Sequence, residues 1–208
     1  MHYPTAETAT PAAWLVPVAR AVPALALAGV ITFTPDHSAP LGFVTFGIFG
    51  VLAGLVALVG ALRAAHGVER GLGVSQAVIT LTAGVVAFLV PQGGLPFLIF
   101  LVTAFAASTG AIELYLGVRA RGYGHGARDR VFVGALTALL AIGLLLVPPG
   151  LAQPLGGIEA VSGVLTASVV VVGALGAYWA VLGVYLVIAG LSIKWAPSSA
   201  TGTADSGA

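Results

Sequence analysis

A glutamate and an arginine lie inside otherwise apolar stretches of the sequence. Glu113 precedes Arg119, the next basic residue, by about 9 Å at 1.5 Å per helical residue. Arg20 lies at a comparable depth in the first apolar stretch. An ionised side chain at such a depth in a lipid bilayer is costly and suggests a functional site by default. We expect Arg20 and Glu113 either to form an intramembrane ion pair, structural or part of a proton or substrate site, or to extend separately to the interface.

A second candidate is the dipeptide Asp36-His37, which lies between two apolar stretches. Histidine titrates near neutral pH, so one interpretation is an outward loop that responds to acid. In the other interpretation the loop only starts the next helix. Asp36 or Ser38 would then accept hydrogen bonds from the first turn, and Pro40 suits that turn. Both interpretations stay open.

Other patterns that carry chemistry are missing from the sequence. The chain has no cysteine, and His66 and His125 belong to separate loops, so we expect no metal site and no thiolate chemistry. The glycine-rich basic loop at 119–130 lacks the Gly-Lys-Ser/Thr of a phosphate-binding loop. That loop could contact anionic lipid headgroups or simply fix the topology. We expect no cofactor, and the net charge of +1 gives no reason to expect nucleic acid.

The composition predicts an integral membrane protein of the all-α class. Of 208 residues, 59% are hydrophobic and only 7% are charged, whereas a soluble domain needs roughly 25% charged residues. The apolar residues form blocks of about 20, the length that crosses a hydrocarbon core about 30 Å thick. These blocks do not alternate as the strands of a membrane barrel do.

We predict six transmembrane helices in one membrane domain over residues 14–194. Their approximate ranges are 14–34, 41–62, 71–90, 95–118, 131–147 and a segment within 164–193. The last segment is longer than one crossing needs, so the start of its helix stays open. We expect residues 1–13 to form a flexible N-terminal head and residues 195–208 a disordered C-terminal tail.

The basic residues predict the orientation. All eight Lys and Arg fall on one side of the predicted membrane domain if Arg20 reaches back to the start of its helix. The opposite loops carry only Asp36 and Glu159 as charges. The positive-inside rule places the basic side, and with it both termini, in the cytoplasm.

Proline spacing predicts an internal repeat. Pro35, Pro91 and Pro148 end the odd-numbered spans, 56 and 57 residues apart (91 − 35 and 148 − 91). Arg63 and Arg119 follow the first two of these prolines by the same offset of 28 (63 − 35 and 119 − 91). The chain is thus predicted to consist of three helical hairpins, at about 14–63, 70–119 and 130–194, of which the third is longer.

Small residues recur along each even-numbered span. The glycines concerned are Gly47, Gly50 and Gly54 in the second span, Gly110 and Gly117 in the fourth, and Gly176, Gly183 and Gly190 in the sixth. Small residues allow helix backbones to approach closely in lipid. We therefore expect the even spans to meet at the centre of the molecule with the odd spans around them. General glycine richness is the alternative explanation.

These features resemble the HdeD family of bacterial acid-resistance membrane proteins over about residues 18–194. The resemblance lies in three hairpins, odd spans that run from a glycine to a closing proline (Gly29 to Pro35, Gly84 to Pro91), and glycine-rich even spans that end in arginine. Residues 31–39 also look like a segment of small actinobacterial membrane proteins of this type. The resemblance implies a stress-linked protein of the bacterial plasma (inner) membrane with no established enzymatic activity, and it supplies no catalytic residues.

Three functions stay open. We favour an HdeD-like structural or accessory protein, linked to acid or envelope stress and not an enzyme. The alternative is a small transporter or channel, although the spans hold few polar groups for a pathway unless a homo-oligomer forms one at a shared interface. Those groups are Ser75, Gln76, Thr80, Thr82, Ser108, Thr109, Glu113, Thr166 and Ser168. A membrane enzyme lacks a visible catalytic constellation. The lipid bilayer is the one partner that the sequence identifies.

Overall fold

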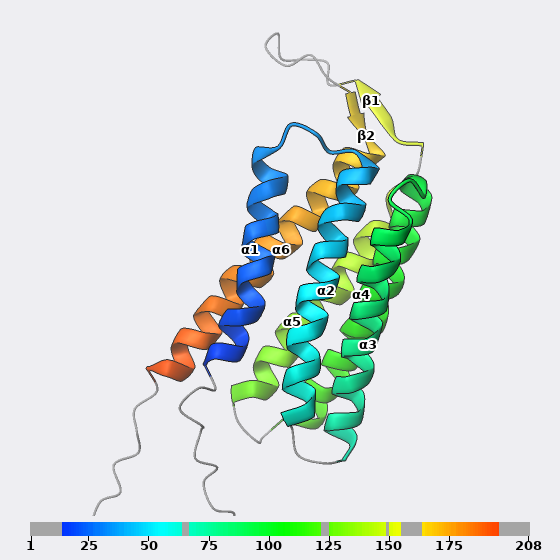
Figure 1. The fold of residues 1–208 in the computed structure, drawn as a ribbon. Coiled ribbons are helices and arrows are strands. Elements are labelled where there is room, and N and C mark those ends of the chain that lie inside the picture. Colours follow the sequence, from blue (N-terminus) through cyan, green and yellow to red (C-terminus); the bar gives the residue numbers. More distant parts are fainter. Residues whose placement is uncertain (1–13, 64–66, 122–124, 149, 155–163, 196–208) are drawn as a thin grey trace, which may run out of the picture.

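The computed structural model describes residues 14–63, 67–121, 125–148, 150–154 and 164–195, and these form a helical bundle (Figure 1). The helices are α1 (Leu15–Phe33), α2 (Ala39–Arg63), α3 (Val68–Leu89), α4 (Gly94–Arg119), α5 (His125–Leu145) and α6 (Ala167–Lys194). Two short strands, β1 (Ala152–Pro154) and β2 (Val164–Thr166), pair at one end of the bundle. The predicted head, the tail beyond Trp195, His66 and Glu159 lie outside the described residues.

Five helices, α1 to α4 and α6, are long and apolar enough to cross a membrane. The structure therefore shows five of the six predicted spans by this measure. The exception is α5, because Arg128, Asp129 and Arg130 lie within its 21 residues. Its apolar part, residues 131–145, is only about 22 Å long at 1.5 Å per residue.

The sixth helix begins at Ala167, three positions into the predicted segment, which started at residue 164 (167 − 164). The residues before it form β2, which pairs antiparallel with β1, Ala152 opposite Thr166. The Ala167 N–H donates to the Leu151 carbonyl oxygen at 3.0 Å, and Thr166 accepts from the Val169 N–H at 3.5 Å. The strand pairing thus satisfies backbone groups that a longer helix would have paired internally, and it adds a small sheet to the predicted all-α fold.

The predicted glycine faces on α2 and α4 lie against odd-numbered helices rather than against one another. A Cβ atom added to Gly50 would lie 2.6 Å from the Gly84 Cα of α3. One added to Gly110 would lie 3.0 Å from the Ala138 nitrogen of α5. The other glycines of α2 and α4 also pack against odd-numbered helices. Gly47 faces Phe88 and Gly54 faces Leu81, both on α3, and Gly117 faces Val131 on α5.

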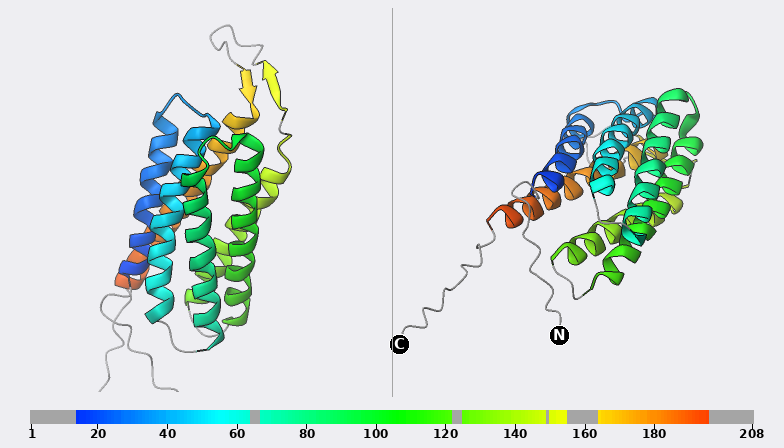
Figure 2. Two further views of the ribbon diagram at one scale, coloured as in Figure 1. Left: turned by 45° about the vertical axis from the view of Figure 1, so that its right-hand side comes forward. Right: turned by 60° about the horizontal axis from the view of Figure 1, so that its bottom comes forward.

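The glycine face of α6 lies against α1, the first helix of the chain. Cβ atoms added to Gly176 and Gly183 would lie 2.8 Å from Ile31 Cγ2 and 2.5 Å from Leu25 Cγ. One added to Gly190 would lie 3.0 Å from the Trp14 carbonyl oxygen. The tightly packed pairs are therefore α2–α3, α4–α5 and α6–α1, the last of which joins the two ends of the helical chain (Figure 2).

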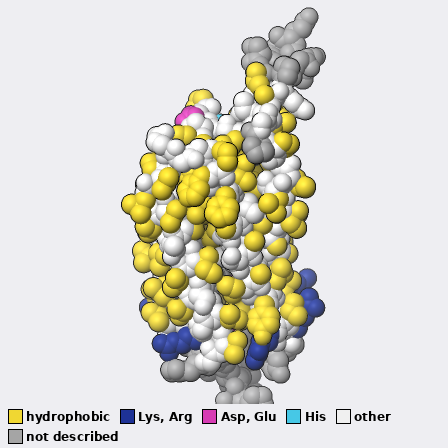
Figure 3. Space-filling view, turned by 90° about the vertical axis from the view of Figure 1, so that its right-hand side faces the viewer, with side chains coloured by type: hydrophobic (Ala, Val, Ile, Leu, Met, Phe, Trp, Pro, Cys, Tyr) yellow, Lys and Arg dark blue, Asp and Glu magenta, His cyan; other side chains and the backbone are white. Residues whose placement is uncertain are grey.

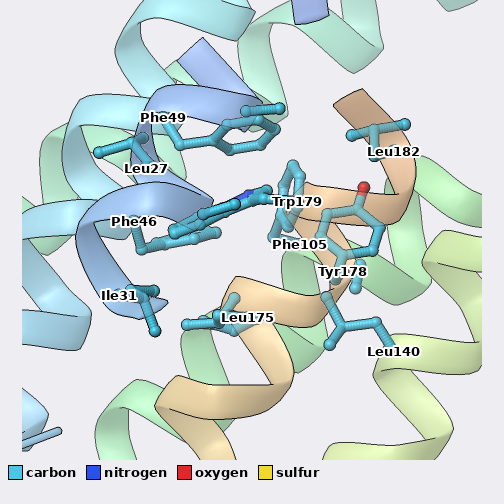
Figure 4. Close-up of a cluster of buried hydrophobic side chains, with 14 of the residues drawn as sticks. Leu27, Ile31, Phe46, Phe49, Phe105, Leu140, Leu175, Tyr178, Trp179 and Leu182 are labelled. Atoms are coloured by element: carbon cyan, nitrogen blue, oxygen red, sulfur yellow. The ribbon is translucent and has the colours of Figure 1, made fainter. Parts of the chain in front are cut away.

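The even-numbered helices also meet one another, through aromatic rings (Figure 4). The Phe46 ring of α2 lies 5.3 Å from the Phe105 ring of α4, centroid to centroid, and Phe49 lies 5.1 Å from Trp179 of α6. Trp179 is fully buried. Glycine is needed where two backbones nearly touch, whereas the wider space between α2, α4 and α6 is filled by rings that bury large areas.

Basic side chains gather at the end of the bundle opposite the strands, which we call the basic end (Figure 3). There α2, α4 and α6 end in Arg63, Arg119 and Lys194. The Lys194 ammonium lies 4.7 Å above the Trp14 ring, so the residue before α1 and the last residue of α6 are neighbours at this end. Between the two ends, exposed large apolar side chains cover the helices, among them Leu52, Leu55, Phe88, Phe100, Leu139 and Ile188.

Candidate functional site

The two ionisable residues of the apolar stretches lie side by side in the structure. Arg20 Nη2 of α1 is 3.5 Å from Glu113 Oε1 of α4. Gln76 of α3 donates from Nε2 to the same carboxylate oxygen at 2.9 Å. The Glu113 side chain is buried, with 9% of its surface exposed, whereas 29% of the Arg20 side chain is exposed. The sequence predicted a comparable depth for Arg20 and Glu113, but it offered no sign that Gln76 would join them.

These three side chains form the inner end of a cavity of about 470 Å³ between α1, α2, α3, α4 and α5. Its rim, at the basic end, is formed by Arg63, Glu69 and Arg130. Glu69 and Arg130 form an ion pair that links α3 to α5. The volume falls in the range of small-molecule sites, roughly 300–1,000 Å³.

Small residues create the cavity. Its walls are formed by Val16, Val56, Ala57, Gly60, Ala61, Gly73 and Leu116. At Gly60 an added Cβ atom would meet nothing within 4 Å, so α2 leaves open space there. The α1–α6 pair also leans away from the other helices toward the basic end (Figures 1 and 2). Short side chains and diverging helices together leave a polar site that ends beside Glu113.

A smaller pocket of about 40 Å³ continues inward from Arg20 and Glu113. Hydroxyl side chains from four helices line it: Thr80, Thr109, Thr137 and Tyr178. The Thr137 hydroxyl donates to the Val133 carbonyl oxygen at 2.7 Å, so the Tyr178 hydroxyl, 3.0 Å away, donates to Thr137. This pocket has the size and the polar groups that a buried water needs.

The aromatic core limits the cavity on the side away from the basic end. Phe105 lines the smaller pocket and contacts Phe46 and Phe49 in the core (Figure 4). In the part of the chain that the structure describes, the cavity thus leads from the basic end to Glu113 and the hydroxyl pocket and stops at packed rings. Among the described residues, the cavity is therefore open at the basic end and bounded by aromatic side chains at its inner end.

The second candidate, Asp36-His37, lies at the opposite end of the bundle and does not join the cavity. Asp36 accepts from the Ser38 N–H at 2.9 Å and from the Ser38 hydroxyl at 3.0 Å. His37 Nδ1 lies 3.3 Å from the Pro35 carbonyl oxygen. The Asp36 contacts fix the turn that leads into α2 at Ala39, although they reach Ser38 and not the first helical turn.

Among the described residues no group of three or more His, Asp or Glu side chains could hold a metal ion. No protein-family model matches the chain, and neither a curated protein nor a solved structure is significantly similar to it.

Proposed function

We propose that this chain is a six-span, non-enzymatic transporter of the bacterial plasma membrane that binds a small charged solute in a cavity reached from the cytoplasm. The observation that carries the proposal is the convergence of Arg20, Gln76 and Glu113 at the inner end of a 470 Å³ cavity. Charged groups inside a membrane domain are expensive, and they are typical of solute and ion pathways.

The geometry favours a transporter over a purely structural protein because polar groups converge on one place. The sequence showed few of them, scattered over several spans. In the fold, Gln76 lines both pockets together with Glu113. Thr80 and Thr109 line the smaller pocket, to which α5 and α6 add Thr137 and Tyr178. A single chain can therefore build a polar site without an oligomeric interface. Assembly with further copies stays a prediction.

The number of membrane crossings that the chain must make supports α5 as the sixth span. Trp14 and Lys194 are in contact at the basic end, which requires an even number of crossings between them. α6 begins at the opposite end, where Ala167 bonds to Leu151. α5 also exposes Leu139, Ile142 and Leu145 by 56–70%, as a lipid-facing helix does. The positive-inside rule then supports an orientation with the basic end and both termini in the cytoplasm.

The repeat is part of the proposal in a modified form. Support comes from the glycine contact that recurs in α2–α3, α4–α5 and α6–α1. Each even helix packs on the next odd helix, and α6 packs on α1 as the cyclic continuation of this order. The repeated unit of packing is therefore shifted by one helix from the hairpin proposed from proline spacing.

The stress-linked role that the HdeD resemblance implies is compatible with a transporter. Its test is the survival of a deletion strain at low pH, complemented with the natural chain or with His37→Ala. Unchanged survival of the deletion strain would remove the stress role. Full complementation by His37→Ala would remove the acid-responsive loop. Neither result would bear on the cavity.

Cysteine labelling tests the cavity directly, because the natural chain contains no cysteine. Ala57 lines both pockets, whereas Leu55, on the same helix, is 49% exposed on the outer surface. A membrane-impermeant thiol reagent should label Ala57→Cys in inside-out vesicles and leave Leu55→Cys unlabelled. Neither variant should react in intact cells.

Solute protection completes the test. A panel of small anions, cations and zwitterions at constant ionic strength is added before the reagent, and at least one solute should slow the labelling of Ala57→Cys. Uptake of that solute into proteoliposomes then tests transport. If Ala57→Cys stays unlabelled, or if no solute protects it, the proposed function is wrong.

A further inference from the structure

Arg20 has donors to spare for a ligand. Its recorded contact with Glu113 is one Nη2–Oε1 approach of 3.5 Å, longer than the roughly 2.7–2.9 Å of a charge-assisted hydrogen bond. A guanidinium has five N–H donors in a planar fork, and this one borders both pockets with part of its surface exposed. Such a fork matches the two oxygens of a carboxylate.

Glu113 depends on Arg20 for its counter-charge. The other donor to its carboxylate is the neutral amide of Gln76 on α3. The remaining charged or titratable groups that line the two pockets are Arg63 of α2, Glu69 of α3, Arg130 of α5 and Tyr178 of α6. Arg63, Glu69 and Arg130 stand at the rim, and Tyr178 donates its hydroxyl to Thr137. Arg20 is thus the one cation beside the carboxylate among the residues lining these pockets.

The charges of the cavity favour an anion. Arg20, Arg63 and Arg130 oppose Glu69 and Glu113, which gives +1 when all are ionised (3 − 2). Glu69 is already paired with Arg130 at the rim. A cavity with an excess of positive charge concentrates anions and repels cations. Any anion that binds to the fork of Arg20 competes with Glu113 for the positive charge of the guanidinium.

We infer that the solute is a small carboxylate anion that binds to Arg20, and that its binding is coupled to the uptake of one proton by Glu113. This inference rests on the proposed function. The contact between Arg20 and Glu113 is exchanged for a contact between Arg20 and the anion. A buried carboxylate without a counter-charge is destabilised relative to its neutral form, so Glu113 takes a proton onto a carboxylate oxygen. One anion and one proton enter together, and the net charge of the site is unchanged.

The surroundings of Glu113 suit this exchange. The larger cavity connects the carboxylate to the basic end, so both the anion and the proton can reach Glu113 from that end. The smaller pocket provides hydroxyl groups that can hold water beside it. Once Glu113 is protonated, its oxygen can still accept from Gln76 Nε2, so the neutral acid keeps a partner in the site.

Isothermal titration of the detergent-purified full chain tests the coupling. The probes are sodium acetate, lactate and succinate, each titrated at one neutral pH in two buffers of different ionisation enthalpy. The buffer dependence of the heat reports the protons exchanged. We expect one proton to be taken up per carboxylate bound. In the infrared difference spectrum, binding should add the carbonyl band of a protonated carboxyl group.

Variants assign the roles. Glu113→Gln should still bind the carboxylate but without proton uptake and without the infrared band, because the amide does not titrate. Arg20→Gln should bind at least about tenfold more weakly, a loss of about 1.4 kcal/mol. Arg121→Gln, at an exposed arginine beyond α4 that does not line the cavity, should behave like the natural chain. The result with the natural chain does not depend on whether any variant folds.

Several outcomes would overturn the inference. Carboxylate binding without proton uptake would disprove the coupling and leave the proposed function intact. Binding of chloride, phosphate, a cation or a zwitterion in place of a carboxylate would disprove the ligand class and also leave the proposed function intact. If no solute of the panel binds, both the inference and the proposed function are wrong.

Discussion

At the scale of single residues, one oxygen of Glu113 collects the polar contacts of the site. Arg20 from α1 and Gln76 from α3 both approach Oε1, so three helices meet at one atom. In a low-dielectric interior each such contact is stronger than in water, and each unmade contact costs more. The amide of Gln76 is the shorter of the two contacts, and it positions the carboxylate toward the arginine.

Replacing Gln76 should therefore destabilise the protein measurably. Gln76→Leu removes a hydrogen bond to a charged group, a contact worth about 1.5–3 kcal/mol. Ser75→Ala is the matched control, because Ser75 is exposed and bonds only to the Gly71 carbonyl oxygen of its own helix. Unfolding in mixed micelles with increasing dodecyl sulfate measures both variants. Equal stability of the two would show that the Gln76 contact contributes nothing.

The residues of this site could be predicted only in part. Arg20 and Glu113 stand out because charges are rare in the apolar stretches, and their matching depth suggested a pair. Gln76 is 37 residues from Glu113, and one amide among several polar residues carries no signal of its partner. Thr137 and Tyr178 were missed for the same reason, since only the packing of α5 on α6 brings their hydroxyls together.

At the scale of helices, the glycines set how close two backbones lie. Gly50 and Gly84 face each other across α2 and α3 with no room for a side chain on either. Gly134 on α5 packs against the α4 backbone in the same way. A Cβ atom added to Gly134 would lie 2.7 Å from the Leu114 nitrogen. Close approach of this kind supplies the packing that joins helices in lipid. It also fixes the helices that carry Gln76 and Glu113.

Two glycines of the odd helices should respond in opposite ways to one added methyl group. In Gly84→Ala the new Cβ would lie 2.7 Å from the Val51 nitrogen, so α2 and α3 must separate, at a cost of about 1–3 kcal/mol. In Gly29→Ala the new Cβ meets nothing within 4 Å, and the helix should gain up to about 1 kcal/mol. Unfolding in mixed micelles compares the two. A gain in both would show that α2 and α3 are not closely packed at Gly84.

The positions of the helices in the sequence were easier to predict than the helices against which each one packs. Long apolar blocks located α1 to α4 within a few residues, because lipid leaves the backbone no other way to satisfy its hydrogen bonds. The small-residue faces were also visible in the sequence. Their partners were not, because a glycine shows that something approaches closely but not which helix does so. The sequence left the start of α6 open, because that start depends on the pairing of β2 with β1, ten or more residues earlier in the sequence.

At the scale of the whole molecule, charge and apolar surface separate along the bundle axis. The described Lys and Arg residues other than Arg20 lie at or just beyond the ends of α2, α4 and α6 or in the first turns of α3 and α5, whereas Asp36 lies between α1 and α2. On the face drawn in Figure 3, Lys and Arg side chains gather near one end and an acidic side chain lies near the other. Between them the surface is dominated by apolar side chains that only lipid or another apolar partner would cover. The cavity opens on the basic side. In the proposed transporter, the orientation of the bundle would therefore decide from which compartment the solute enters the cavity.

Two glycines on either side of the apolar part of α5 test this orientation and the sixth span together. Gly126 and Gly150 lie before and after the apolar part of α5, and at each an added Cβ atom meets nothing within 4 Å, so a cysteine fits at both. With an impermeant thiol reagent, Gly150→Cys should label in intact cells and Gly126→Cys only in inside-out vesicles. The cysteine-free natural chain gives the background.

Labelling of both cysteines from one side would mean that α5 does not cross the membrane. The contact of Trp14 with Lys194 at one end would then be impossible in a membrane, because five crossings place those residues on opposite sides. Labelling from opposite sides but in the reverse sense would keep six spans and direct the cavity outward.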